Sequence, residues 1–157
     1  MIAASRGAAE AVNILLKKGA DPNVRDASTG ATALMIAAGN GHEKVARLLL
    51  ENGADANAKD TSTGFTALML ASAKGHVDFV KILVEMGVEV DAQAEDGTTA
   101  LMIAAANGQR ETVEFLLQNE ADPRLKNSRD FTAFQYAQMK AHEDIVEILR
   151  DTAEGRE

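Results

Sequence analysis

The chain has 157 residues, of which 46% are hydrophobic and 4% aromatic, and its formal net charge is −8 at pH 7. This acidic balance argues against a nucleic-acid backbone or an anionic membrane as the main partner, because both select for clustered Lys and Arg. The absence of cysteine excludes disulfides and thiolate metal sites, and no apolar run approaches the roughly 20 residues that span a bilayer.

A seven-residue sequence motif recurs along the chain. TALMIAA occupies 32–38 and 99–105, and its relatives TALMLAS and TAFQYAQ occupy 66–72 and 132–138. A second word, Gly-Ala-Asp or a close relative, keeps the same spacing. Two independent words with one period indicate internal repeats. The threonines that open the first word, Thr32, Thr66, Thr99 and Thr132, are 34, 33 and 33 residues apart.

Each repeat predicts two helices and a polar turn. The chain opens inside the first helix of a unit, because Met1 aligns with Met35. In a complete unit the first helix begins at a threonine, a favourable N-cap, and is expected over 32–40 in the first such unit. The second helix has apolar residues at helical spacing and an acidic residue near its start. It is expected over 43–52, 77–86, 110–119 and 143–151, and Gly19, Gly53 and Gly87 are expected to take a left-handed conformation at the ends of second helices.

This pattern resembles the ankyrin repeat, a unit of 33 residues with two helices and a β-turn. The resemblance covers essentially the whole chain as one domain, 1–157. It implies an all-α solenoid of stacked helix-turn-helix units with β-turn or hairpin loops. The units would be 1–25 (partial), 26–59, 60–93, 94–126 and 127–157, the last acting as a C-terminal cap. Shared positions include Gly30, Thr32, Leu34, Ala37, Ala38, Gly41, His42, Val45, Gly53, Ala54, Asp55 and Asn57.

Three departures from the family pattern carry expectations. Methionine replaces the family histidine of Thr-Pro-Leu-His, and a methionine there can only pack between repeats. Glu120 replaces the glycine that ends the second helix, so a positive φ there would cost on the order of 1 kcal/mol. The last unit loses two more glycines, at Asp130 and Ala141, and carries a charged second helix, which is typical of a terminal unit that faces water.

No residues in the sequence form a catalytic or ligand-binding pattern. His42, His76 and His142 stand in separate repeats at equivalent positions, which favours a role in stacking over metal binding or catalysis. No glycine-rich loop is followed by Lys-Ser or Lys-Thr, so a nucleotide site is not expected. We therefore predict no catalytic residues, no metal and no cofactor.

The positions that differ between repeats are the candidates for binding. In stacks of this kind, the turn tips and the ends of first helices line one concave groove. Phe65 and Phe131 are not needed for stacking, and an aromatic anchor with flanking Lys and Arg is typical of a protein-binding hot spot. The alternative is that each ring folds onto the neighbouring turn. The predicted protein-binding residues are Phe65, Lys74, Phe131, Arg129, Lys140, Asn40, Asn107, Thr98, Asp60 and Asp96.

The resemblance implies a non-enzymatic module that binds a partner protein or peptide in this groove. Two other functions stay open: a regulatory or anchoring segment of a longer enzyme or channel, and an engineered repeat scaffold. We expect a cytoplasmic monomer without nucleic-acid partners or membrane insertion. End-to-end pairing of chains through first-repeat residues such as Ile2, Val12 and Leu16 is an alternative to the monomer.

Overall fold

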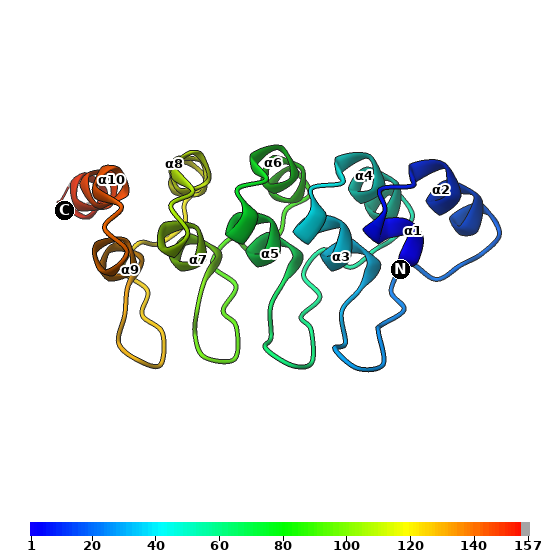
Figure 1. The fold of residues 1–157 in the computed structure, drawn as a ribbon, viewed down its shortest axis with the longest axis horizontal. Helices are drawn as coiled ribbons and strands as arrows, with labels where there is room; N and C mark the ends of the chain where they lie inside the picture. The colour runs from blue at the N-terminus through cyan, green and yellow to red at the C-terminus, as the bar shows by residue number, and fades with distance from the viewer. Residues whose placement is uncertain (155–157) are drawn as a thin grey trace.

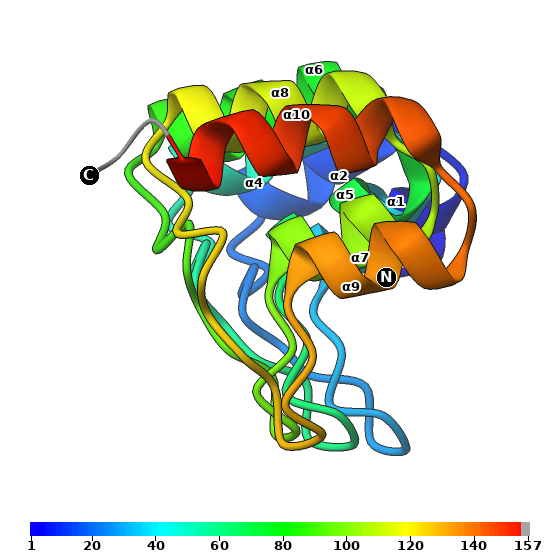
Figure 2. The ribbon, with the colours of Figure 1, turned by 90° about the vertical axis from the view of Figure 1, so that its left-hand side faces the viewer.

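The computed structural model describes residues 1–154, and over this range ten helices form two parallel rows without a sheet (Figure 1). This arrangement confirms the expected all-α class. The loops that join successive helix pairs project together from one side of the rows (Figure 2). The first helices are α1 (Ile2–Ser5), α3 (Ala33–Asn40), α5 (Ala67–Lys74), α7 (Ala100–Ala106) and α9 (Ala133–Met139). The second helices are α2 (Ala9–Lys17), α4 (Glu43–Glu51), α6 (Val77–Glu85), α8 (Arg110–Gln118) and α10 (Glu143–Glu154).

The repeated threonine starts each first helix from α3 onward. The Thr32 hydroxyl accepts a hydrogen bond from the backbone N–H of Met35 at 3.3 Å, which satisfies one of the free donors of the first turn. The methionines at this position are buried between repeats, as expected. Met35 also does more than pack, because its sulfur lies 3.4 Å from the backbone nitrogen of Thr32. The same threonine cap opens α5, α7 and α9 at Thr66, Thr99 and Thr132.

Glycine and histidine pack together after α1, α3 and α7, whereas Gly75 after α5 meets Gln109 instead. Gly41 has a φ of 69°, and a Cβ built there would lie 2.9 Å from the ring of His76 in the next repeat. The equivalent distance is 2.7 Å between Gly7 and His42, whose Nε2 is also 3.0 Å from the carbonyl oxygen of Ser5. The glycine therefore leaves room for a ring that the following repeat inserts. This contact explains the histidine spacing by stacking alone.

Polar side chains also join each repeat to the next. Asn23 accepts from the backbone N–H of Asp55 at 2.7 Å, and Asn57 accepts from that of Glu89 at 3.0 Å. The Nζ of Lys59 donates to the carbonyl oxygen of Gln93 at 2.7 Å. These bonds recur at equivalent positions of successive units, so the same residue types carry the same contact along the row.

The glycine substitutions in the later repeats keep the backbone of the glycines that they replace. Glu120 has a φ of 67°, so the strain expected for a positive φ at this position applies, and Asp130 and Ala141 have φ values of 64° and 57°. The second helices α4, α6 and α8 each end one residue earlier than expected, at Glu51, Glu85 and Gln118, whereas α10 continues to Glu154.

The prediction of exposed residues on the first repeat is correct for Ile2, which is 73% exposed, and wrong for Val12, which is buried at 5%. Leu16 is partly buried against the core. Val12, Leu15 and Leu16 line one hollow with Ala33 and Leu49 of the next repeat, and Leu15 is 49% exposed. Leu49 holds the same position in α4 and is only 2% exposed, since a helix pair precedes it.

Two hydroxyls in the core have no hydrogen-bond partner within the described part of the chain: Ser72 Oγ and Thr112 Oγ1. Ser72 occupies the position of Ala38 and Ala105, both buried. We expect Ser72→Ala and Thr112→Val each to raise the free energy of unfolding by about 1 kcal/mol, because a buried unpaired hydroxyl loses its bonds to water without replacement.

Chemical denaturation of the two variants measures this gain. Thr152→Val is the matched control, because the hydroxyl of Thr152 donates to the carbonyl oxygen of Ile148 at 2.8 Å and its removal should give no gain. Equal stabilisation by all three substitutions would assign the effect to apolarity in general and contradict the interpretation.

Candidate protein-binding groove

The first helices and the loops meet at an angle (Figure 2). A pocket of about 310 Å³ is lined by residues of three consecutive repeats, from their first helices and the loops before them. The fifth residue of the repeated seven-residue motif contributes to it. This residue follows the buried methionine position and is apolar or aromatic in every copy. Ile103 and Tyr136 are the copies that line the pocket. The complete lining is Phe65, Ala73, Thr98, Met102, Ile103, Ala106, Asn107 and Tyr136.

Tyr136 connects the pocket to the last loop. Its ring lies 5.7 Å from that of Phe131, with the two planes tilted by 58°. Its hydroxyl accepts hydrogen bonds from Arg129 Nη2 at 2.9 Å and from Asn127 Nδ2 at 2.8 Å. The Arg129 guanidinium carbon also stands 5.9 Å from the centre of the Phe131 ring, within the range of a cation–π contact. The four side chains form one ordered cluster with a cation at its edge.

The structure brings some of the predicted residues together. Phe65, Thr98 and Asn107 line the same pocket, and Phe131 and Arg129 adjoin it through Tyr136. Phe65 is partly buried against the core. Thr98 is only 8% exposed, so it offers little surface to a partner.

The remaining predicted residues lie outside the pocket lining. Lys74 and Lys140 are exposed at the ends of α5 and α9. Asn40 is also exposed, and its side-chain amide donates to the carbonyl oxygen of Ile36 at 2.7 Å, which occupies one donor at the end of its own helix.

Asp60 and Asp96 hold the loops in shape. Burial raises the pKa of Asp60, but hydrogen bonds from Thr63 and Ser62 outweigh it and bring the pKa below its ordinary value. The pKa of Asp96 is lowered chiefly by the side-chain hydrogen bond with Thr98. Both carboxylates are therefore charged acceptors whose bonds are made within the loops.

Sequence reasoning missed Tyr136 and Ile103. The fifth residues of the four copies are Ile36, Leu70, Ile103 and Tyr136, so the change from aliphatic to aromatic was visible. The signal was weak because Tyr136 stands in the degraded copy, where most letters differ from the others.

The comparison with protein families identifies the repeat. The family model of ankyrin repeats, built on three copies, matches residues 1–94 and again 86–156. The chain belongs to the ankyrin repeat family. Ankyrin repeats generally act as protein–protein interaction modules rather than enzymes. No curated protein matches the chain.

Two other features of this ankyrin domain bear on its partners. None of the helices in residues 1–154 combines the length and apolarity needed to cross a membrane. Within the same residues, His, Asp and Glu side chains form no group of three that could hold a metal ion.

Proposed function

We propose that this ankyrin domain binds a segment of a partner protein in the groove over α5, α7 and α9. The single observation that supports this site most directly is the pocket of about 310 Å³ formed jointly by Phe65, Ile103 and Tyr136. Such a pocket accepts an apolar side chain, and its aromatic walls supply contact area with few rotatable bonds. The groove spans three repeats, so it suits an extended or helical segment better than a small molecule.

The polar groups around the pocket fix how a partner would lie. Asn107 donates to the carbonyl oxygen of Ile103 at 2.8 Å through its side-chain amide, and its amide oxygen accepts no hydrogen bond within the described residues. Arg129 donates to the hydroxyl of Tyr136, and Lys74 follows Ala73 of the lining at the end of α5, so both add positive charge near the pocket. A partner with an apolar anchor and polar flanks therefore fits this surface, with the anchor contributing most of the binding energy.

Replacing Phe65 by Ala tests the groove. Loss of one aromatic wall should weaken partner binding by 10-fold or more, because truncating a hot-spot residue costs roughly 2 kcal/mol. Partners are first captured on the wild-type domain and identified, and the affinity of a purified partner is then measured by calorimetry. Phe131→Ala should weaken binding less, since Phe131 reaches the pocket only through Tyr136.

The control is Met86→Ala, a substitution of an apolar residue that is 53% exposed at the end of α6, outside the groove. It should leave affinity unchanged. A melting temperature that falls in Phe65→Ala while affinity stays at the wild-type value would make the ring a packing residue and reject this groove.

A further inference from the structure

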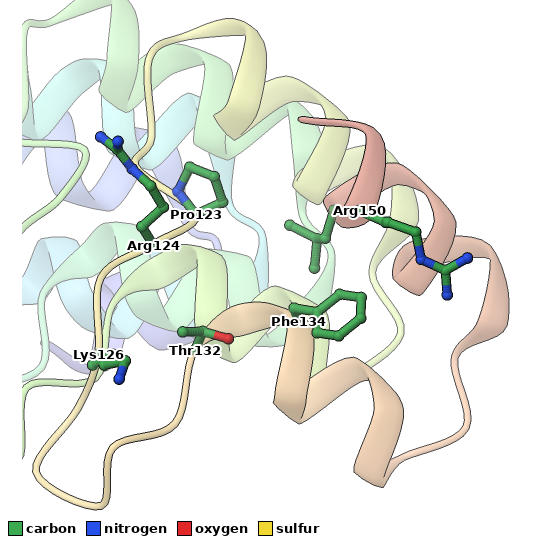
Figure 3. Close-up of a pocket in the computed structure, with 7 residues that line it drawn as sticks. Pro123, Arg124, Lys126, Thr132, Phe134 and Arg150 are labelled. Atoms are coloured by element: carbon green, nitrogen blue, oxygen red, sulfur yellow. The ribbon is translucent and has the colours of Figure 1, made fainter. Parts of the chain in front are cut away.

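The outer face of the last repeat carries a second hollow, separate from the groove (Figure 3). It has a volume of about 360 Å³ and lies between α9, α10 and the loop that precedes α9. Phe134 and Leu149 form its apolar floor together with Pro123, and three cationic side chains surround them. We call it the end cup. Its lining is Pro123, Arg124, Lys126, Thr132, Phe134, Leu149 and Arg150.

Phe134, in the floor of the end cup, occupies a position that is buried between repeats elsewhere in the array. Phe134 aligns with Leu34, Leu68 and Leu101, which are 1%, 2% and 1% exposed because the next repeat covers each of them. Phe134 is only partly buried. A terminal unit that merely faced water would place a polar residue here, as it does at Gln135. This unit has an apolar residue larger than the one it replaces.

A further repeat in the same register would have to shift to pack over this floor. Ala141 aligns with Gly108, and a Cβ built on that glycine would lie 2.8 Å from the ring of His142 in the next repeat. Asp130 aligns with Gly97, and a Cβ built on that glycine would lie 3.1 Å from the Cα of Asn127 in the next repeat. Both substituted residues have a Cβ that would meet an incoming unit. These two side chains therefore favour a ligand smaller than a helix pair over Phe134.

The three cations occupy positions that contact the next repeat elsewhere in the array. Arg150 replaces Leu50, which is 7% exposed. Arg124 replaces Asn57, which accepts from the backbone N–H of Glu89, and Lys126 aligns with Lys59, which donates to Gln93. All three positions face the side on which a next repeat stacks elsewhere in the array. Three positive groups therefore meet at one apolar surface, although the chain has a net charge of −8.

We infer that the end cup binds an acidic peptide segment of a partner protein, with an apolar side chain on Phe134 and carboxylates against the surrounding cations. Arg124 pairs with Asp122 at 3.0 Å and Lys126 with Asp130 at 2.9 Å, but their side chains are 71% and 53% exposed and retain free donors. Arg150 has no ion pair within residues 1–154. Charge complementarity selects an anionic partner over a neutral or basic one.

Selection from a random heptapeptide phage library tests the inference. Wild-type domain and the variants Phe134→Ser and Arg150→Gln are panned in parallel, after circular dichroism has shown that each variant folds. Peptides enriched on the wild type should carry Asp or Glu beside an apolar residue. A synthetic copy of an enriched peptide should bind both variants at least 10-fold more weakly, and more weakly at high salt.

Two controls separate the end cup from the groove. Arg47→Gln removes an exposed arginine of α4 and should leave peptide affinity unchanged. Phe65→Ala should also leave it unchanged, even if the proposed groove fails its own test. Amide chemical shifts on peptide binding should change at Phe134, Leu149 and Arg150.

Four outcomes would overturn the inference. One is an enriched set without acidic residues, and another is the absence of any peptide that distinguishes the wild type from both variants. A third is a set of shift changes confined to Phe65 and Tyr136. The fourth is a dimer in sedimentation that Phe134→Ser abolishes, which would assign the cup to a second copy of the chain.

Discussion

Replacing Phe79 by Ala is expected to lower the free energy of unfolding by about 3–5 kcal/mol, the largest loss from any single truncation considered. Among the residues described, Phe79 is the largest fully buried side chain. It lies in α6 of the middle repeat, at a position held by the smaller Val45 and Ile145 in other units. The surrounding side chains are fitted to a ring, so Ala leaves a cavity that only partial relaxation can fill.

Guanidinium denaturation followed by circular dichroism measures this loss. The matched control is Met86→Ala, which removes an apolar side chain from the end of the same helix where it is 53% exposed. It should cost less than about 1 kcal/mol. A loss in Phe79→Ala no larger than in the control would show that the middle of the array does not depend on this contact.

Replacing Gly41 by Ala is expected to lower the free energy of unfolding by roughly 2–4 kcal/mol. Two effects combine. The φ of 69° places an L-residue in the left-handed region, and the new Cβ would lie 2.9 Å from the ring of His76. The ring must move, which disturbs the seam between the second and third repeats.

Gly39→Ala is the control for this variant. Gly39 lies in α3, two residues earlier, and a Cβ built there meets no atom within 4 Å. Alanine should therefore stabilise the helix by about 0.5–1 kcal/mol. The same denaturation experiment should therefore show a lower free energy of unfolding for Gly41→Ala and a higher one for Gly39→Ala. If both alanines stabilise the chain, the interlock between glycine and histidine is too loose to matter.

Much of the fold was predictable because stacking repeats its contacts. The threonine caps, the buried methionines and the positive φ of Glu120 each follow from a residue type at a fixed place in the period. Identical neighbours require identical contact residues, so one repeat informs the others. The family assignment rests on the same regularity.

The exposed surfaces were less predictable, because the exposure of a residue depends on whether a neighbouring repeat covers it. Leu15 and Leu49 share a position but differ in exposure, 49% against 2%, according to whether a helix pair precedes them. The sequence alone assigned Val12 to the exposed face because its helix periodicity does not show which neighbour it meets. Tyr136 and the end cup were missed for a related reason, since both lie in the repeat that departs most from the shared pattern.

The Cβ atoms of Ala141 and Asp130 also affect how copies of the chain could assemble. Joining the tail of one copy to the head of another is a heterologous contact, which grows into an open filament unless its rotation closes a ring. The exposed Ile2 and Leu15 at the head invite such growth. Two side chains at the tail, placed where glycines make room for the following repeat inside the array, work against that geometry.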